Sequence, residues 1–164
     1  MMSERIYLNN DWKFAEQFEA SMTEAAYDDS VMQNVRLPHT CKETPLHYFD
    51  EHCYQMVSGY RRVIEAEEAW KGKKILLTID GAAHDSEVFL NGDKVGEHHC
   101  GYTAFTMDIS GVLRYGEKNI LVVKVDSRED LNIPPFGYVI DYMTYGGIYR
   151  DVYLDIKNKD YIED

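Results

Sequence analysis

The sequence predicts an all-β domain, and two observations support that prediction. From residue 60 onward, short stretches rich in β-branched and aromatic residues recur, each bounded by Gly, Asn, Asp or Ser. No alternation of strand-like and helix-like stretches appears, which argues against a parallel sheet. Because isolated hairpins cannot bury their apolar faces, many short strands at regular spacing indicate a β-sandwich or a β-barrel.

Seven segments are expected to form strands. Residues 74–80 and 150–156 alternate between an apolar and a polar face, as half-buried strands do. Residues 119–125 are apolar on both faces, which predicts a central strand covered on both sides. Asn91-Gly92 predicts a type I′ hairpin turn, because both residues accept a positive φ. The expected strands are 60–65, 74–80, 86–90, 94–98, 103–109, 119–125 and 150–156.

The first 55 residues are polar and weakly periodic. Residues 15–26 have the composition of a helix. Their apolar positions do not share one helical face, so a helix and an irregular segment are equally compatible with the pattern. The length of 164 residues predicts a single domain over 1–164.

The charge and the cysteines exclude several classes of protein. A net charge of −12 repels phosphate backbones and anionic lipids, so neither nucleic-acid nor membrane binding is expected. The N-terminus has no signal-like apolar run, so a cytoplasmic location is expected. Cys41, Cys53 and Cys100 are odd in number and widely spaced. Free thiols are therefore expected, with one disulfide bridge as the alternative.

Neither a metal site nor a cofactor site is expected. The sequence contains no G-x-S-x-G, H-E-x-x-H, P-loop or G-x-G-x-x-G motif. His98 and His99 are adjacent in a predicted strand, so their side chains point to opposite faces and cannot readily share one ion. The histidines are therefore interpreted as surface or core-edge residues.

Residues 127–147 interrupt the strand pattern with two prolines, three glycines and several aromatic residues. A loop of this length inside a compact domain is typically functional or packed into a lobe. Asp141 lies between Tyr138 and Tyr142, and aromatic faces with a carboxylate acceptor suit a neutral polyol. The alternative is that these rings only pack the loop onto the sandwich. Arg150 could pair bidentately with Asp151 or Asp141.

Several motifs then occur in a recognisable order. Residues 81–110 read GAAHDSEVFLNGDKVGEHHCGYTAFTMDIS, and four flanking segments accompany them: LNNDWKF (8–14), VRLPHT (35–40), YRR (60–62) and GGIYRDVYL (146–154). Together they resemble the N-terminal domain of family 2 glycoside hydrolases, the β-galactosidase and β-glucuronidase group. The resemblance implies a jelly-roll β-sandwich of the galactose-binding-domain-like type. Tryptophans usual in this family are replaced by Met32 and by Ser58 or Gly59, which we interpret as packing substitutions.

The resemblance also implies further domains. In this family an immunoglobulin-like domain and a (β/α)₈ barrel follow, and the barrel carries both catalytic glutamates of a retaining mechanism. A barrel needs ~250 residues, more than this chain offers. The chain alone is therefore expected to be inactive, and its parent protein is expected to hydrolyse O-glycosidic bonds in a β-glycoside.

The family also suggests which residue contacts the sugar. In its members an aspartate six residues before the Gly of the G-I-x-R motif reaches the barrel's sugar site, and the matching residue is Asp141. The expected substrate-binding residues are Asp141, Tyr138 and Tyr142. Two alternatives remain open: a free-standing carbohydrate-binding module, and a purely structural domain whose acidic surface mediates contacts in a homo-oligomer.

Overall fold

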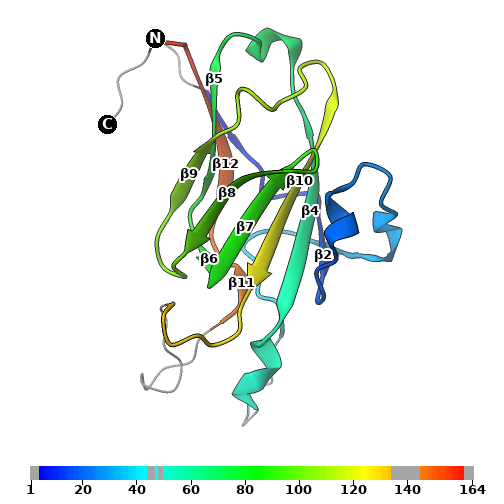
Figure 1. The fold of residues 1–164 in the computed structure, drawn as a ribbon, viewed down its shortest axis with the longest axis vertical. Helices are drawn as coiled ribbons and strands as arrows, with labels where there is room; N and C mark the ends of the chain where they lie inside the picture. The colour runs from blue at the N-terminus through cyan, green and yellow to red at the C-terminus, as the bar shows by residue number, and fades with distance from the viewer. Residues whose placement is uncertain (1–3, 44–46, 48–49, 134–144, 161–164) are drawn as a thin grey trace.

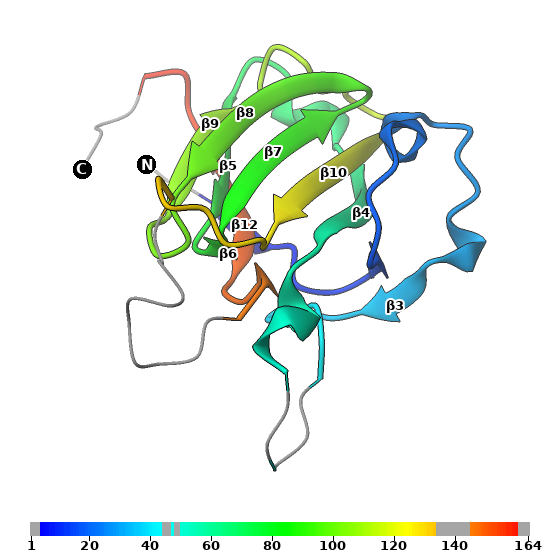
Figure 2. The ribbon, with the colours of Figure 1, turned by 60° about the horizontal axis from the view of Figure 1, so that its bottom comes forward.

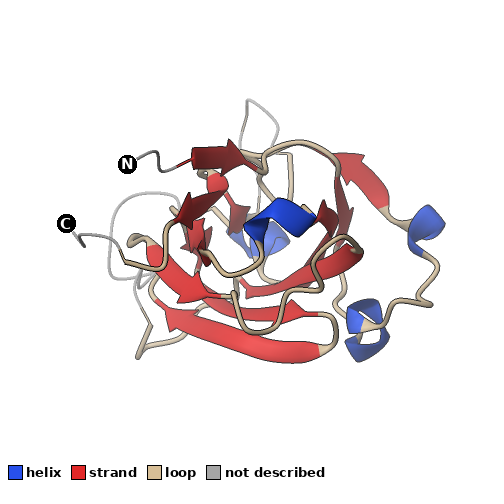
Figure 3. Ribbon diagram, turned by 90° about the horizontal axis from the view of Figure 1, so that it is seen from above, coloured by secondary structure: helices blue, strands red, loops and turns tan. Residues whose placement is uncertain are grey.

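The computed structural model describes residues 4–43, 47, 50–133 and 145–160. They fold as predicted into a jelly-roll β-sandwich of two packed antiparallel sheets (Figures 1 and 3). One sheet has the order β1 (Glu4–Tyr7), β12 (Val152–Lys157), β5 (Lys74–Ile79), β9 (Phe105–Asp108). The other has the order β3 (Gln33–Val35), β2 (Trp12–Ala15), β4 (Val57–Glu65), β10 (Lys118–Asp126), β7 (Asp85–Leu90), β8 (Asp93–His99). A short pair is formed by β6 (Ala82–Ala83) and β11 (Gly147–Ile148).

The described helices are all short 3₁₀ turns in connections between strands (Figure 3). They are η1 (Ala20–Thr23), η2 (Asp29–Val31), η3 (Glu51–Tyr54) and η4 (Glu68–Trp70). None of these described helices is long and apolar enough to cross a membrane.

Alternating side chains of the predicted strands fill the space between the sheets. On β5, Ile75, Leu77 and Ile79 are fully buried, and each lies opposite an apolar residue of β12. Burying a side chain of this size contributes about 1.5–3 kcal/mol to stability. This alternation therefore determines which face of each strand turns inward. All seven predicted strands are confirmed.

Strand β10 is covered on both faces, as the sequence predicts. Its outward-facing Val122 is fully buried beneath Met22 and Met32, which form a second apolar cluster. The cover is the segment between β2 and β3, which lies beside β4 in Figure 1. Gly59 makes room for it, because a Cβ there would lie 2.6 Å from the Met22 sulfur. Met32 and Gly59 thus both contribute to the packing of this second cluster.

The predicted hairpin turn is confirmed at Asn91-Gly92, where φ is 54° and 95° respectively. The Asn91 side chain also holds the turn against the start of β10. Its amide donates to the Asn119 side chain (2.8 Å), and its carbonyl oxygen accepts from the Ile120 backbone (3.0 Å). Residues 15–26 form no α-helix, and only η1 is helical there. Tertiary contacts of that segment override its helix propensity.

Arg61 on β4 fastens the covering segment to the sheet. Its side chain is buried, with 3% of the residue exposed. Nε donates to the Met22 carbonyl (3.1 Å), and Nη2 donates to the Glu24 carbonyl (3.2 Å). Nη1 forms an ion pair with Asp29. All three partners lie between residues 22 and 29, in the segment between β2 and β3, so one guanidinium fastens the middle of that segment.

We expect Arg61→Ala to lower the free energy of unfolding by about 1–3 kcal/mol, because it leaves the Met22 and Glu24 carbonyls without their donor. Arg5→Ala is the matched control, since Arg5 pairs with Asp155 (2.7 Å) but its side chain is 47% exposed. An exposed pair contributes about 0–1 kcal/mol. Urea denaturation of the three proteins measures the difference. Equal losses in both variants would contradict the role assigned to Arg61.

Candidate functional site

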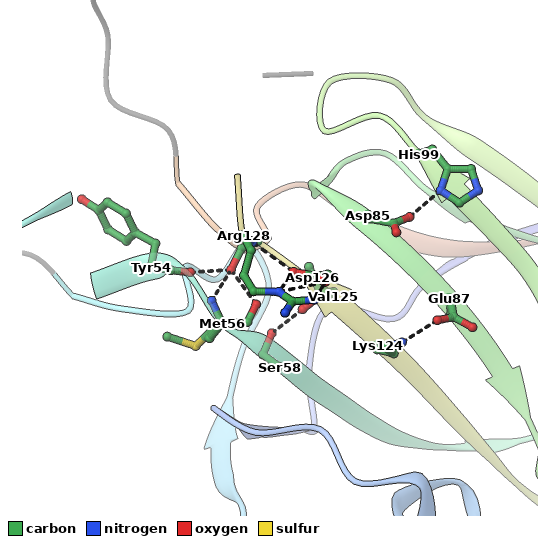
Figure 4. A network of polar contacts seen from close by, with 11 residues as sticks. Tyr54, Met56, Ser58, Asp85, Glu87, His99, Lys124, Val125, Asp126 and Arg128 are labelled. Atoms are coloured by element: carbon green, nitrogen blue, oxygen red, sulfur yellow. Dashed lines mark hydrogen bonds and ion pairs between the residues drawn. The ribbon is translucent and has the colours of Figure 1, made fainter. Parts of the chain in front are cut away.

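The loop that the sequence singles out starts directly after β10, where its first residue is anchored. Ser127 is buried, and its backbone N–H donates to the Met56 carbonyl (2.9 Å). Its hydroxyl lies within hydrogen-bonding distance of the carbonyls of Tyr54 and Met56, the second at 3.1 Å. Figure 4 shows these contacts joining the exit of β10 to the residues before β4. The outgoing end of the loop is therefore tied to the core.

The returning end of the loop is anchored beside it. The backbone N–H of Cys41 donates to the Gly146 carbonyl (2.9 Å), and that of His39 donates to the Ile148 carbonyl (2.8 Å). A Cβ on Gly146 would lie 2.4 Å from that of Ser127 and 2.8 Å from the Cys41 sulfur. Only a glycine allows the three segments to approach this closely. We call His39, Cys41, Ser127 and Gly146, together with Gly147, the loop root.

An aromatic cluster supports the loop root from inside the sandwich. His39 Nδ1 lies 2.8 Å from the Tyr60 hydroxyl, and the His39 ring packs against Phe14 with 4.8 Å between centroids. Gly147 adopts a φ of +111°, and a Cβ there would meet the Tyr60 hydroxyl at 2.6 Å. Burial lowers the pKa of His39, so the ring stays neutral at neutral pH. The loop root is thus held by packing and by hydrogen bonds together.

A polar pocket of about 340 Å³ adjoins the loop root. It lies where β10 ends and β7 begins, and Figure 4 shows Arg128, Asp126 and Asp85 on this side. Arg128 binds both carboxylate oxygens of Asp126, with Nε 2.9 Å from the nearer one. Asp85 pairs with Nδ1 of His99 (2.6 Å). The pocket is lined by Gln55, His84, Asp85, Asp126, Arg128, Glu129, Asp130 and Ile133.

His84 is the least exposed of the charged or imidazole side chains in this pocket. Only 4% of the residue is exposed, and its Nδ1 has no hydrogen-bond partner among the described residues. Burial lowers the pKa of His84, which favours the neutral imidazole. Most buried polar atoms in proteins have a partner, so this one requires an explanation.

Comparison with known proteins places this architecture in a family. Residues 6–158 match the family model described as "Glycosyl hydrolases family 2, sugar binding domain". The chain belongs to this family.

Individual relatives agree with this assignment. The domain is 42% identical over 160 residues to a β-galactosidase of Thermoanaerobacter pseudethanolicus, covering 97% of the chain and 22% of the relative. It is 34% identical to a β-glucuronidase of Bacteroides fragilis, covering 94% and 21%. The solved Bacteroides uniformis β-glucuronidase 2, covalently bound to cyclophellitol-6-carboxylate aziridine, superimposes with a TM-score of 0.82 at 32% identity. That match covers 94% of the domain and 18% of the enzyme. The domain thus spans about a fifth of the length of these relatives.

The predicted substrate-binding residues Asp141, Tyr138 and Tyr142 lie outside the described residues, so they remain predictions. Of the aromatic residues in the loop, Tyr145 is described. Its ring packs against that of Tyr54, with 5.7 Å between centroids. The Tyr145 ring therefore packs the loop onto the sandwich, which is the alternative role considered for the aromatic residues of the loop.

The expected pairing of Arg150 with Asp151 is wrong. The Arg150 guanidinium lies over the Tyr149 ring, 5.4 Å from its centroid. The Asp151 carboxylate instead accepts from the Asn9 side chain (2.9 Å) and helps to join the N-terminal segment to β12. The pairing of Arg150 with Asp141 remains a prediction.

His98 and His99 point to opposite faces of β8, as predicted. His98 stacks on Phe105 with 4.4 Å between centroids, whereas His99 turns the other way to Asp85. Within the described ranges, no group of three or more His, Cys, Asp or Glu side chains could hold a metal ion. The three cysteines are free thiols.

No motif in the sequence marks the pocket of this domain. Asp126, Arg128, Glu129 and Asp130 form a charged run at the exit of a buried strand, which is a usable signal. His84 gives no such signal, because a histidine before a strand is common. Only the pairing of β7 with β10 brings it beside Asp126, whose backbone carbonyl accepts from the His84 N–H (3.0 Å).

We expect Gly146→Ala to destabilise the domain by about 1–3 kcal/mol, because the added methyl group overpacks the loop root. Gly111→Ala is the matched control, since a Cβ there would meet no atom within 4 Å. Its effect should stay within about 0.5 kcal/mol. Thermal and urea denaturation compare the two variants with the parent sequence. An unchanged stability of Gly146→Ala would show that the three segments are not closely packed in solution.

We also expect stability to fall as the pH drops from about 7.5 to 5.5. Burial lowers the pKa of His39 and of His84 below that of a free imidazole, so the unfolded chain binds more protons than the folded one in this range. Unfolding is therefore favoured as the pH falls through 6.5. The pKa of His99 is raised by Asp85, which opposes the trend, but this ring is largely exposed. Urea denaturation at the two pH values measures the effect.

The matched variants are His84→Phe and His99→Gln. The first should flatten the dependence of stability on pH, and the second should steepen it. A His84→Phe profile identical to that of the parent sequence would mean that His84 titrates alike in the folded and unfolded chains.

Proposed function

We propose that this chain is the N-terminal accessory domain of a family 2 glycosidase of the β-galactosidase or β-glucuronidase type. It presents its long loop, with Asp141, to a sugar site that a following (β/α)₈ barrel completes. The observation that supports this proposal is the loop root, where both ends of the loop are tied to the core within one small region. Binding groups on loops depend on such a rigid scaffold to position them.

The loop root gives the loop a defined origin. Ser127 and Gly146 are neighbours in space although they lie nineteen positions apart in the sequence. Fixing both ends lowers the conformational entropy that the loop loses when it meets a ligand or another domain. The loop and its carboxylate can then contribute to sugar binding at a smaller entropic cost.

In this proposal the hydrolytic step belongs to the following domains, and the chain by itself is inactive. Retaining hydrolysis requires one carboxyl group as acid and base and a second, about 5–5.5 Å away, as nucleophile. At the end of the sandwich that carries the loop root, Asp126 is paired with Arg128, and Asp85 is paired with His99. Pairing with a cation favours the ionised form of a carboxyl group, so neither of these two is suited to be the proton donor. The proposed partners are a β-glycoside and the following immunoglobulin-like and barrel domains.

We expect Asp141→Asn, in the full-length protein, to lower kcat/KM by roughly 10- to 100-fold with the fold intact. A hydrogen bond to a charged group contributes about 1.5–3 kcal/mol, and each 1.4 kcal/mol corresponds to a factor of ten. Asp93→Asn is the matched control, because Asp93 is exposed at the far end of the β7–β8 hairpin. Hydrolysis of nitrophenyl β-galactoside and β-glucuronide measures both variants.

Two results would contradict the proposal. One is an unchanged kcat/KM for Asp141→Asn on every glycoside that the parent protein hydrolyses. The other is a native polypeptide of 19.1 kDa, the mass of this chain alone, on an immunoblot of source cells. That second result would favour a free-standing module.

A further inference from the structure

The outer face of the four-stranded sheet is open, whereas the segment between β2 and β3 covers part of the six-stranded sheet. Alternation with core residues turns Arg5 and Tyr7 of β1 outward, and it does the same for Thr106 and Asp108 of β9. These four residues lie on the two edge strands, and all are exposed, Tyr7 to 55%. A large exposed aromatic residue on an open sheet face is a candidate contact for another protein surface.

Side chains on this face already hold one another in place. Arg5 donates to both carboxylate oxygens of Asp155, at 2.7 and 2.9 Å, and its guanidinium lies 4.0 Å from the centroid of the Tyr153 ring. The Tyr7 ring meets the same Tyr153 ring edge-on, with 5.7 Å between centroids. Side chains fixed in this way lose little conformational entropy when a partner binds. Tyr and Arg are also the residue types enriched at the energetic centre of protein interfaces.

The charge on this face differs from that of the chain as a whole. The chain has a net charge of −12, so most orientations of two copies are repelled. The outward charged side chains on these four strands, in contrast, are three basic and two acidic: Arg5, Lys74, Lys157, Asp108 and Asp155. A second copy therefore approaches this face without the repulsion that the acidic remainder of the chain causes.

The register of the sheet makes this face complementary to itself. One row across β1, β12, β5 and β9 consists of Arg5, Asp155, Leu76 and Asp108. A twofold axis parallel to the strands, midway between two copies, places β1 of each copy over β9 of the other and keeps each row in line. Arg5 of one copy then faces Asp108 of the other, and the same contact occurs twice. Sheets that pack face to face keep their strands within about 30° of each other, which this axis satisfies.

We propose that two copies of this chain associate through the outer faces of their four-stranded sheets, with Arg5 opposite Asp108 at two symmetry-related contacts. Four strands ~4.8 Å apart and about four to six residues long give a face of roughly 300–400 Å² in outline. A standard stable complex buries about 800 Å² on each partner, so this dimer is weak and reversible. The association needs no following domain, so its failure would leave the proposed function untouched.

The first test is sedimentation velocity of this chain from about 5 μM to about 1 mM, in ~150 mM salt to screen the long-range repulsion between acidic copies. We expect the average mass to rise from 19.1 kDa toward twice that value, with a dissociation constant on the order of 0.1–1 mM. The backbone amide NMR signals of Tyr7 and Thr106 should shift over the same concentrations. A chain that is monomeric throughout, or amide shifts confined to another face, would overturn the proposal.

Charge-reversal variants test the twofold contact itself. Arg5→Asp and Asp108→Arg each place like charges opposite one another twice, so each should raise the dissociation constant at least ~10-fold. The double variant restores opposite charges and should return the constant to within ~3-fold of the parent value. Circular dichroism and the melting temperature establish that each variant is folded.

Lys94→Asp is the matched control for Arg5→Asp. Lys94 lies on β8 in the other sheet, is exposed and is paired with Glu87 and Glu97, and its reversal changes the net charge by the same amount. This variant should associate as the parent does. A loss of association as large as that of Arg5→Asp, or a double variant that is not rescued, would overturn the proposal.

Discussion

Strands β4 and β10 pair antiparallel over nine residues, from Lys118 opposite Glu65 to Asp126 opposite Val57. The position of every part of the candidate site depends on where this pairing ends (Figure 2). At that end, Ser127 meets the residues that precede β4, and the next turn carries the pocket. A register slip of one residue would exchange the two faces of β10, because side chains alternate with a period of two. The loop root and the buried core therefore both depend on the register in which β10 pairs with β4.

The side chains that stabilise the fold and the polar groups of the candidate site lie in different parts of the domain. The interior between the sheets is apolar, and the outer face of β10 is closed by Met22, Met32 and the Arg61 network. Nδ1 of His84 and the Ser86 hydroxyl, buried polar atoms without a hydrogen-bond partner among the described residues, lie instead near the end with the long loop. Burying a polar atom without a hydrogen-bond partner lowers the stability of the fold by about 1–3 kcal/mol. The rest of the sandwich can tolerate that cost because its core is large and continuous.

The loop root and the pocket share one stretch of backbone, from Asp126 to Ile133. Any molecule or domain that meets one of them therefore lies close to the other. Ser127 anchors the stretch, whereas Asp126 and Arg128 on either side of it turn toward the pocket.

The sequence by itself determined the seven strands, the turn at Asn91-Gly92, the doubly covered β10 and the family, because alternation, turn chemistry and motif order are local properties. Only the tertiary structure decided the rest. Strands β1 and β3 lie at sheet edges and are mostly exposed, so no apolar alternation marks them. Residues 15–26 cover a sheet instead of forming a helix because Arg61, far along the chain, binds their carbonyls. His84 and Asp126 lie 42 positions apart in the sequence and become neighbours only because β7 pairs with β10. A local sequence pattern cannot predict a contact of this kind.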